Sequence, residues 1–129
     1  MEEIKISSVD TENVEKDDSF ETAYAFFVKL NKSPDSAWES LFENYWKNML
    51  YSMKRSAIVG GDNIRLVYGK DDPLQSLIDF LNQVISHTNK AYQSHIEEQE
   101  RIKLREEAKR KNIEETREGI KDKLKGLKF

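Results

Sequence analysis

A chain of 129 residues is long enough for one domain, but 35% of its residues are charged and only 37% are apolar. Globular proteins average about 25% charged residues, so we expect a modest core together with a solvated or extended segment. The chain contains no cysteine, which excludes disulfides, thiolate zinc sites and a cysteine nucleophile.

The net charge of −3 is distributed unevenly. Residues 1–22 hold eight acidic and two basic residues, a net charge of −6, whereas residues 97–129 hold eleven basic and nine acidic residues, a net charge of +2. A chain so balanced has no overall field that attracts a polyanion, so any nucleic-acid site must be a local patch. The sequence shows no signal peptide and no apolar run of membrane-spanning length. We expect a cytoplasmic protein with no membrane partner.

Alternating apolar residues predict two strands in the first 30 residues. Residues 3–9 give a weak strand signal, and the acidic run 10–19 is typical of a loop. Residues 22–30 give the strongest strand signal in the chain. Large apolar residues occupy every second position of this strand: Tyr24, Phe26, Val28 and Leu30. Phe27 lies on the other face, which indicates a central strand or one covered on both sides.

A helix is expected to begin at Pro34, with Ser33 as its N-cap, because a proline at the first helical position loses no hydrogen bond. Apolar residues then recur at three- and four-residue spacing over about twenty residues: Trp38, Leu41, Phe42, Tyr45, Trp46, Met49, Leu50 and Met53. A stripe this wide predicts that both tryptophans are buried against the sheet, rather than exposed in a ligand pocket.

The segment AIVGGDNIRLVYG, residues 57–69, contains the motif most like a binding site. A phosphate-binding loop needs Gly-x-x-x-x-Gly-Lys-Ser/Thr, but Gly61 is followed by Asp62, whose carboxylate repels a phosphate. Glycine and asparagine instead suit the turn of a β-hairpin, because the tight turns of hairpins need positive φ. The segment therefore predicts a hairpin.

Two registers of this hairpin are open. A turn at residues 61–62 pairs Val59 with Ile64, whereas a turn at residues 62–63 changes the partners but keeps the same residues on that face. Both registers bury one apolar face, formed by Ala57, Val59, Ile64, Leu66 and Tyr68. Both expose Arg65 on the other face.

A second helix is expected to begin at Asp72 and Pro73, which repeat the cap-then-proline pattern. Its apolar residues again recur at helical spacing: Leu74, Leu77, Ile78, Leu81, Val84, Ile85, Ala91 and Tyr92. The predicted order is strand, strand, helix, strand, strand, helix. This order favours an α+β fold with an antiparallel four-stranded sheet and both helices on one face. We place this compact domain at residues 1–96.

Residues 97–129 predict a charged helical extension, because twenty of these 33 residues are charged and acidic residues precede basic ones at helical spacing. One heptad frame gives a partly apolar seam, although Glu106 and Lys109 occupy its middle. Dimerisation through this helix, a solvated helix and docking onto another partner all stay open. The residues that we nominate for an interaction are Ile102, Ile113, Ile120, Leu124 and Leu127.

Motifs for catalysis or for a cofactor are missing from the sequence. His87 and His95 are eight residues apart, too far along a helix for both to bind one metal. No calcium-binding loop and no serine-nucleophile motif occurs. We expect no metal or other cofactor. The sequence identifies no catalytic residue, although an active site built from residues distant in sequence stays open.

The densest basic group lies in the extension and gives an alternative interpretation, in which a helix follows a nucleic-acid backbone. Its candidate residues are Lys103, Arg105, Lys109, Arg110 and Lys111. Glu106 and Glu107 lie between them and favour mutual neutralisation. The sequence therefore predicts a protein-interaction or assembly module that self-associates, in its simplest form as a homodimer. A nucleic-acid-associated accessory protein is the alternative.

Overall fold

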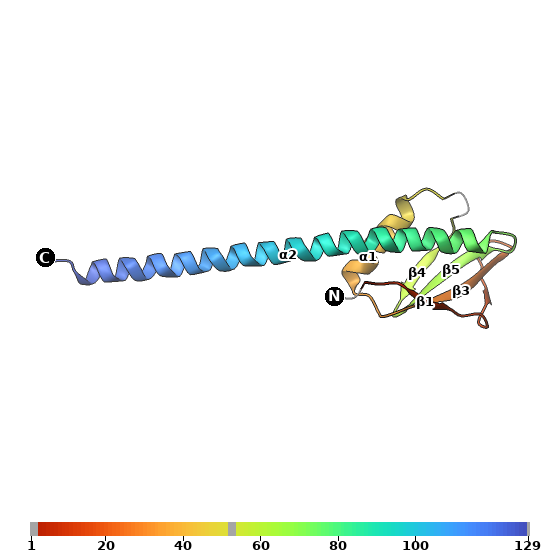
Figure 1. The fold of residues 1–129 in the computed structure, drawn as a ribbon, viewed down its shortest axis with the longest axis horizontal. Helices are drawn as coiled ribbons and strands as arrows, with labels where there is room; N and C mark the ends of the chain where they lie inside the picture. The colour runs from red at the N-terminus through yellow and green to blue at the C-terminus, as the bar shows by residue number, and fades with distance from the viewer. Residues whose placement is uncertain (1–2, 52–53, 129) are drawn as a thin grey trace. The chain divides into compact units, whose positions relative to one another are not determined.

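The computed structural model shows an α+β fold and describes residues 3–51 and 54–128 (Figure 1). Its elements in chain order are β1 (Ile6–Val9), β2 (Glu15–Lys16), β3 (Ala23–Leu30), α1 (Ser36–Asn48), β4 (Ala57–Gly60), β5 (Asn63–Gly69) and α2 (Leu74–Lys125). The chain divides into two units, Met1–Tyr92 (unit 1) and Gln93–Phe129 (unit 2). All five strands lie in unit 1, whereas α2 has residues in both units.

The five strands form one antiparallel sheet with the order β1-β3-β5-β4, and β2 pairs with β3. Because β5 occupies one edge of β3, β1 and β2 both pair with the other edge. The prediction of four strands in the order ββαββα is therefore wrong, since β2 is a further strand within the run expected to be a loop. Glu15 and Lys16 are both exposed, so no apolar alternation marks this strand in the sequence.

The central position predicted for residues 22–30 is confirmed. Phe26, Val28 and Leu30 are buried in the main core. On the opposite face of β3, Ala23 and Ala25 are buried in a small second cluster with a residue of β5. The side chain of Phe20 packs against this cluster, so β3 is covered on both sides.

The first helix begins later and ends earlier than predicted. Its N-cap is Asp35 rather than Ser33, because the Asp35 carboxylate accepts a hydrogen bond from the backbone N–H of Trp38 at 2.9 Å. The helix has 13 residues and ends at Asn48, after which Met49 is extended. Leu50 is 99% exposed rather than part of the buried stripe. Met53, also expected in the helix, lies outside the described residues.

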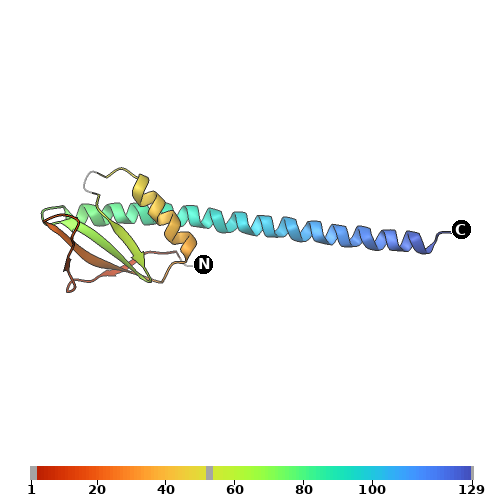
Figure 2. The ribbon, with the colours of Figure 1, turned by 180° about the vertical axis from the view of Figure 1, so that it is seen from behind.

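The main core of unit 1 lies between one face of the sheet and the two helices (Figures 1 and 2). Helix α1 buries Trp38, Phe42 and Trp46, whose rings stack in sequence with centroids 5.4 and 6.0 Å apart. Helix α2 contributes six buried residues: Leu77, Phe80, Leu81, Val84, Ile85 and Thr88. The predicted burial of both tryptophans and the predicted placement of both helices on one face are confirmed. Leu74, also expected to be buried, is 47% exposed.

The hairpin takes the first of the two predicted registers. Val59 pairs with Ile64, and Gly60 pairs with Asn63 around the turn. Gly61 has φ of +60°, the left-handed conformation that glycine adopts most easily. The predicted apolar face packs against the main core. Arg65 lies on the opposite face but is only half exposed there, because residues of the 10–19 segment contact its side chain.

Helix α2 is one helix of 52 residues. Unit 1 contains its first part, up to Tyr92, and unit 2 contains the rest. Within unit 2, every described residue from Glu97 to Lys128 is exposed.

Candidate interaction surfaces

The five residues nominated for an interaction all lie in unit 2 and are all exposed. Their exposed fractions are 37% for Ile102, 57% for Ile113, 52% for Ile120, 59% for Leu124 and 61% for Leu127. The first four lie in α2, and Leu127 follows its end. Exposed large apolar residues are informative when they gather on one face, because scattered ones are normal on any protein.

Ile102, Ile113, Ile120 and Leu124 share one face of the helix, and we call them the apolar stripe. They are separated by 11, 7 and 4 residues, which are close to three, two and one helical turns. A shallow hollow of about 410 Å³ lies along this face. It is lined by Asn112, Ile113, Thr116, Arg117, Ile120 and Lys121.

Basic residues border the apolar stripe. Helical residues three or four positions from a stripe residue lie beside it, and those with a positive charge are Arg105, Lys109, Arg110, Arg117, Lys121 and Lys123. We call these six the basic border. Only two acidic residues, Glu98 and Glu106, stand at the same spacings. The face that contains the stripe is therefore both apolar and positively charged.

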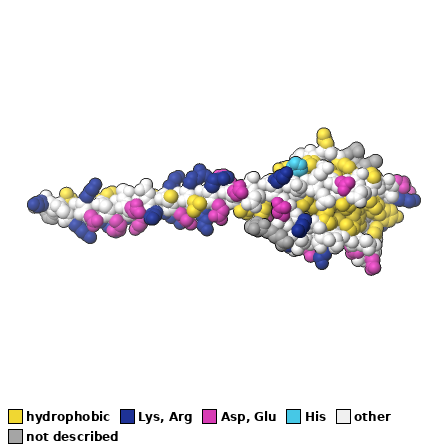
Figure 3. Space-filling model, in the orientation of Figure 1, with side chains coloured by type: hydrophobic (Ala, Val, Ile, Leu, Met, Phe, Trp, Pro, Cys, Tyr) yellow, Lys and Arg dark blue, Asp and Glu magenta, His cyan; other side chains and the backbone are white. Residues whose placement is uncertain are grey.

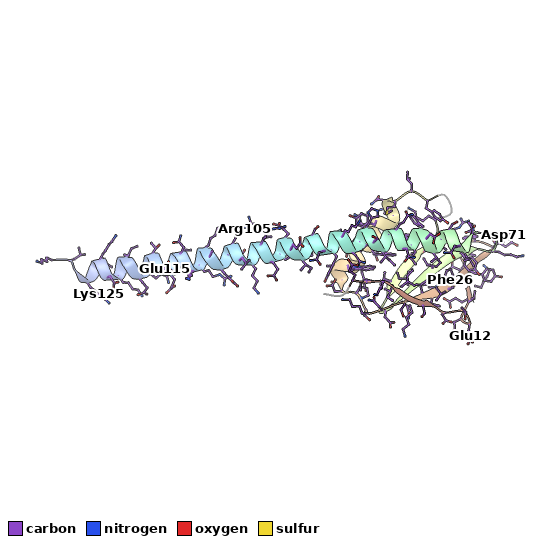
Figure 4. The ribbon with its side chains drawn as sticks, in the orientation of Figure 1. Glu12, Phe26, Asp71, Arg105, Glu115 and Lys125 are labelled. Carbon is purple, nitrogen blue, oxygen red and sulfur yellow. The ribbon has the colours of Figure 1, made fainter. Side chains whose placement is uncertain are left out.

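Acidic residues gather on the opposite face of the same helix. Steps of three or four residues connect Glu97, Glu100, Leu104, Glu107, Lys111, Glu115, Glu118, Asp122 and Lys125 into one row. Six of these nine are acidic and two are basic. Figure 4 labels Arg105 from the basic border and Glu115 from the acidic row. The charges of unit 2 are thus separated around the helix, although its net charge is small.

Ion pairs along this helix are exposed, and four of the six residues of the basic border take part in them: Arg105, Arg110, Arg117 and Lys121. Arg105 and Arg101 both contact Glu98, at 3.3 and 3.1 Å, and Arg110 lies 4.0 Å from Glu106. Pairs this exposed contribute little free energy, so a partner can replace them. Lys109 has no ion pair among the residues that the structure describes.

The structure does not bring all five nucleic-acid candidates together. Three belong to the basic border: Arg105, Lys109 and Arg110. Lys103 lies seven residues from Arg110, on the flank of that border. Lys111 lies in the acidic row, four residues from both Glu107 and Glu115. No single face therefore presents these five charges to a phosphate backbone.

A second surface, which the sequence analysis did not find, is an apolar hollow of about 290 Å³ in unit 1. Its apolar lining is Val9, Val14, Phe26, Tyr68, Leu74 and Ile78. Of these, Val9, Val14 and Leu74 are large exposed apolar residues, at 39%, 50% and 47%. Figure 3 shows a broad group of hydrophobic side chains on the visible face of unit 1. The lining comes from segments far apart in the sequence, so no local pattern marks it.

Acidic residues border this apolar hollow. Asp10 and Thr11 are its polar lining. The pKa of Asp10 is lowered because its carboxylate accepts hydrogen bonds from the Asn13 side chain and from the backbone N–H groups of Glu12 and Asn13. Between Lys5 and Lys16 the sequence contains acidic residues and no basic one. Figure 3 shows magenta and dark blue groups around the hydrophobic surface of unit 1, and Figure 4 labels Phe26, Glu12 and Asp71.

Ion pairs on the other face of the sheet have a structural role. The Arg65 guanidinium donates to Glu15 and Asp17, both at 2.9 Å. Hydrogen bonds from the side chain and backbone of Ser19, together with Arg65, lower the pKa of Asp17 to about 2. These contacts hold the 15–19 segment against β5, and we assign no binding role to them.

No metal site is present among residues 3–51 and 54–128, where no cluster of three or more potential ligands occurs. The His87 ring stacks on Tyr45, with centroids 5.9 Å apart. His95 lies in unit 2 and is exposed. Within the same described ranges, no helix is long and apolar enough to cross a membrane.

No family model, curated protein or solved structure matches this chain. Function is therefore inferred from two surfaces: the apolar stripe with its basic border in unit 2, and the acidic-bordered apolar hollow in unit 1.

Proposed function

We propose that this protein is an interaction module that binds a protein partner through the apolar stripe and the basic border of unit 2. The supporting observation is the separation of side-chain types around one exposed helix: apolar and basic residues share one face, and acidic residues occupy the other. A helix that only meets solvent gains from opposite charges three or four residues apart, but this gain does not require apolar and basic residues to share one face. A helix that lays one face against an apolar, acidic surface does.

The charges also bear on which partner binds. In a coiled coil, the residues that flank the apolar seam of one helix face those of the other. Two copies of this helix paired stripe to stripe would place basic borders against each other, and like charges in such positions are destabilising. The simple coiled-coil homodimer is therefore disfavoured, and an acidic surface on the partner is favoured.

A nucleic-acid partner is the alternative, and the apolar stripe argues against it. Binding to a phosphate backbone needs positive charge and does not need four exposed aliphatic residues among those charges. Lys111, in the acidic row, would also face away from such a ligand.

The test compares two full-length variants as bait in extracts of the native cells. Ile113→Ser with Ile120→Ser removes half of the apolar stripe. Leu104→Ser is the matched control, because Leu104 is 61% exposed but lies in the acidic row. Each isoleucine contributes about 1.5–3 kcal/mol when fully buried, so we expect at least a tenfold loss of captured partner from the stripe variant and no loss from the control. Far-UV circular dichroism verifies equal helix content.

Two results contradict the proposal. One is equal capture by wild type, stripe variant and control. The other is a nucleic acid whose binding is lost in Lys109→Ala with Arg110→Ala but retained in the stripe variant, with a steep dependence on salt.

A further inference from the structure

We infer that the partner is a second copy of this chain, bound head to tail, with the apolar stripe of one copy seated on the apolar hollow of unit 1 of the next copy. This inference rests on the proposed function and names its partner. Three properties of the two surfaces carry it: their shape, their charge and their location in different units.

The shapes and apolar surfaces are complementary. The hollow is concave, and its rim exposes Val9, Val14 and Leu74. The stripe projects from a single helix and presents Ile120 and Leu124 about one helical turn apart. An amphipathic helix that places residues at this spacing into an apolar groove is a recurring mode of recognition. A hollow of about 290 Å³ has room for a few aliphatic side chains, not for a whole domain.

The charges are complementary as well. Over residues 1–92 the chain holds 15 acidic and 10 basic residues, a net charge of −5, whereas residues 93–129 hold 9 acidic and 11 basic residues, a net charge of +2. Asp10 is the one acidic residue in the lining of the hollow, and Glu12, two positions further along the chain, is exposed. The Asp10 carboxylate is ionised at neutral pH, and the hydrogen bonds that lower its pKa favour this charged form. The basic border beside the stripe supplies the opposite charge.

The two surfaces are different patches of one chain, so the contact between copies is heterologous. A dimer formed in this way retains one unoccupied stripe and one unoccupied hollow, and further copies can add to both. Assembly is therefore expected to increase with concentration, either to a closed ring or to open chains. Because the attraction includes exposed charges, added salt is expected to weaken it.

The test uses two complementary variants of the full chain. The hollow variant is Val14→Ser with Leu74→Ser, and the stripe variant is Ile120→Ser with Leu124→Ser. All four residues are exposed, so the fold is retained, which thermal unfolding verifies. Light scattering and sedimentation velocity give the masses. We expect wild type and the Leu104→Ser control to assemble with increasing concentration, and each variant alone to stay at the 15.1 kDa of one chain.

The decisive result is the equimolar mixture of the two variants. It contains one intact hollow and one intact stripe, so it should form a heterodimer of twice the mass of the chain and nothing larger. Raising the salt from 0.1 to 1 M should shift this complex at least tenfold towards monomer, because the screening length falls from about 10 to about 3 Å.

Three results overturn the inference. If the hollow variant alone still dimerises, stripes pair with stripes. If wild type stays monomeric at every concentration, the partner is a different molecule. If the monomer instead binds phosphatidylserine vesicles through the stripe, the acidic surface that the stripe recognises is a membrane and not a protein. If wild type stays monomeric but the stripe variant captures less partner protein than wild type, the proposed function stands and only the inference of self-assembly is wrong. Binding to vesicles contradicts both the proposed function and the inference.

Discussion

Helix α2 contains two rows of apolar residues, one buried in unit 1 and one exposed in unit 2. In unit 1 its residues Leu77, Leu81 and Val84 are buried against the sheet and α1. In unit 2 Ile120 and Leu124 are also four residues apart, but both are more than half exposed. Spacing alone thus does not determine burial: an apolar stripe is buried where the rest of the chain supplies a surface. For the exposed stripe of unit 2, we propose that another molecule supplies this surface.

The largest expected difference between the two regions comes from one substitution made twice in the same helix. Leu81→Ala removes a side chain with no exposed surface, and leucine-to-alanine changes in cores destabilise by about 2–5 kcal/mol. Leu124→Ala removes a side chain that is 59% exposed and is expected to change stability by less than about 0.5 kcal/mol. Urea unfolding of dilute protein measures both. A cost above about 1 kcal/mol for Leu124→Ala would show that the stripe is already covered.

A smaller loss is expected when the polar contact within the core of unit 1 is removed. The Asn89 side chain accepts a hydrogen bond from the Trp38 indole N–H at 2.9 Å and donates one to the Ile4 carbonyl at 2.7 Å. Asn89→Ala leaves the indole N–H without this partner, so we expect a loss of about 1–3 kcal/mol in the free energy of unfolding. Asn82→Ala, an exposed position of the same helix, is the control. Equal values for the two variants would contradict the prediction.

The hairpin turn gives a still smaller and sharper comparison between neighbouring glycines. Gly61 has φ of +60° and Gly60 lies in a strand, and a Cβ at either position meets no atom within 4 Å. Gly61→Ala is therefore expected to cost about 1–2 kcal/mol from backbone strain alone, while Gly60→Ala changes stability by less than about 0.5 kcal/mol. Urea unfolding compares the two. A larger loss from Gly60→Ala would mean that steric contacts, not φ, set the cost.

This turn also shows what the sequence could predict. The strand of residues 22–30, the hairpin and the positions of both helices follow from local signals: apolar periodicity, glycine in a turn and proline near a helix start. The end of α1 could not be predicted from local signals, because Met49 and Leu50 continue the apolar pattern beyond the last helical residue, Asn48. Tyr51 lies outside the helix, and its ring stacks on Phe80 with centroids 4.6 Å apart. That contact joins residues distant in sequence.

Of the two candidate surfaces, one could be predicted from the sequence and the other could not. The apolar stripe was predictable, because its residues and the sorting of charges around them follow from spacing within one helix. The apolar hollow was not, because Val9, Phe26, Tyr68 and Leu74 come together only when the sheet and helix are assembled. Predicting it would require the register of β1 against β3, which shifts between Ile6 and Ser8.

The smallest expected effect concerns β2, the strand that the sequence did not reveal. Hydrogen bonds from Ser19, and then from Arg65, lower the pKa of Asp17 to about 2 from an ordinary value of 3.8. A carboxylate with a lowered pKa stabilises the folded state above its unfolded pKa, and this contribution disappears as the pH falls through the folded pKa. Asp17→Asn should therefore be less stable than wild type at pH 5–7, and the difference should shrink below about pH 4 and vanish only below about pH 2. Urea unfolding across this range measures the difference in stability.

The control is Glu98→Gln, which removes two exposed ion pairs in unit 2. It should leave the unfolding of unit 1 unchanged throughout this pH range. A difference for Asp17→Asn that persists undiminished well below pH 2 would mean that its hydrogen-bond geometry, rather than its charge, holds β2 on the sheet.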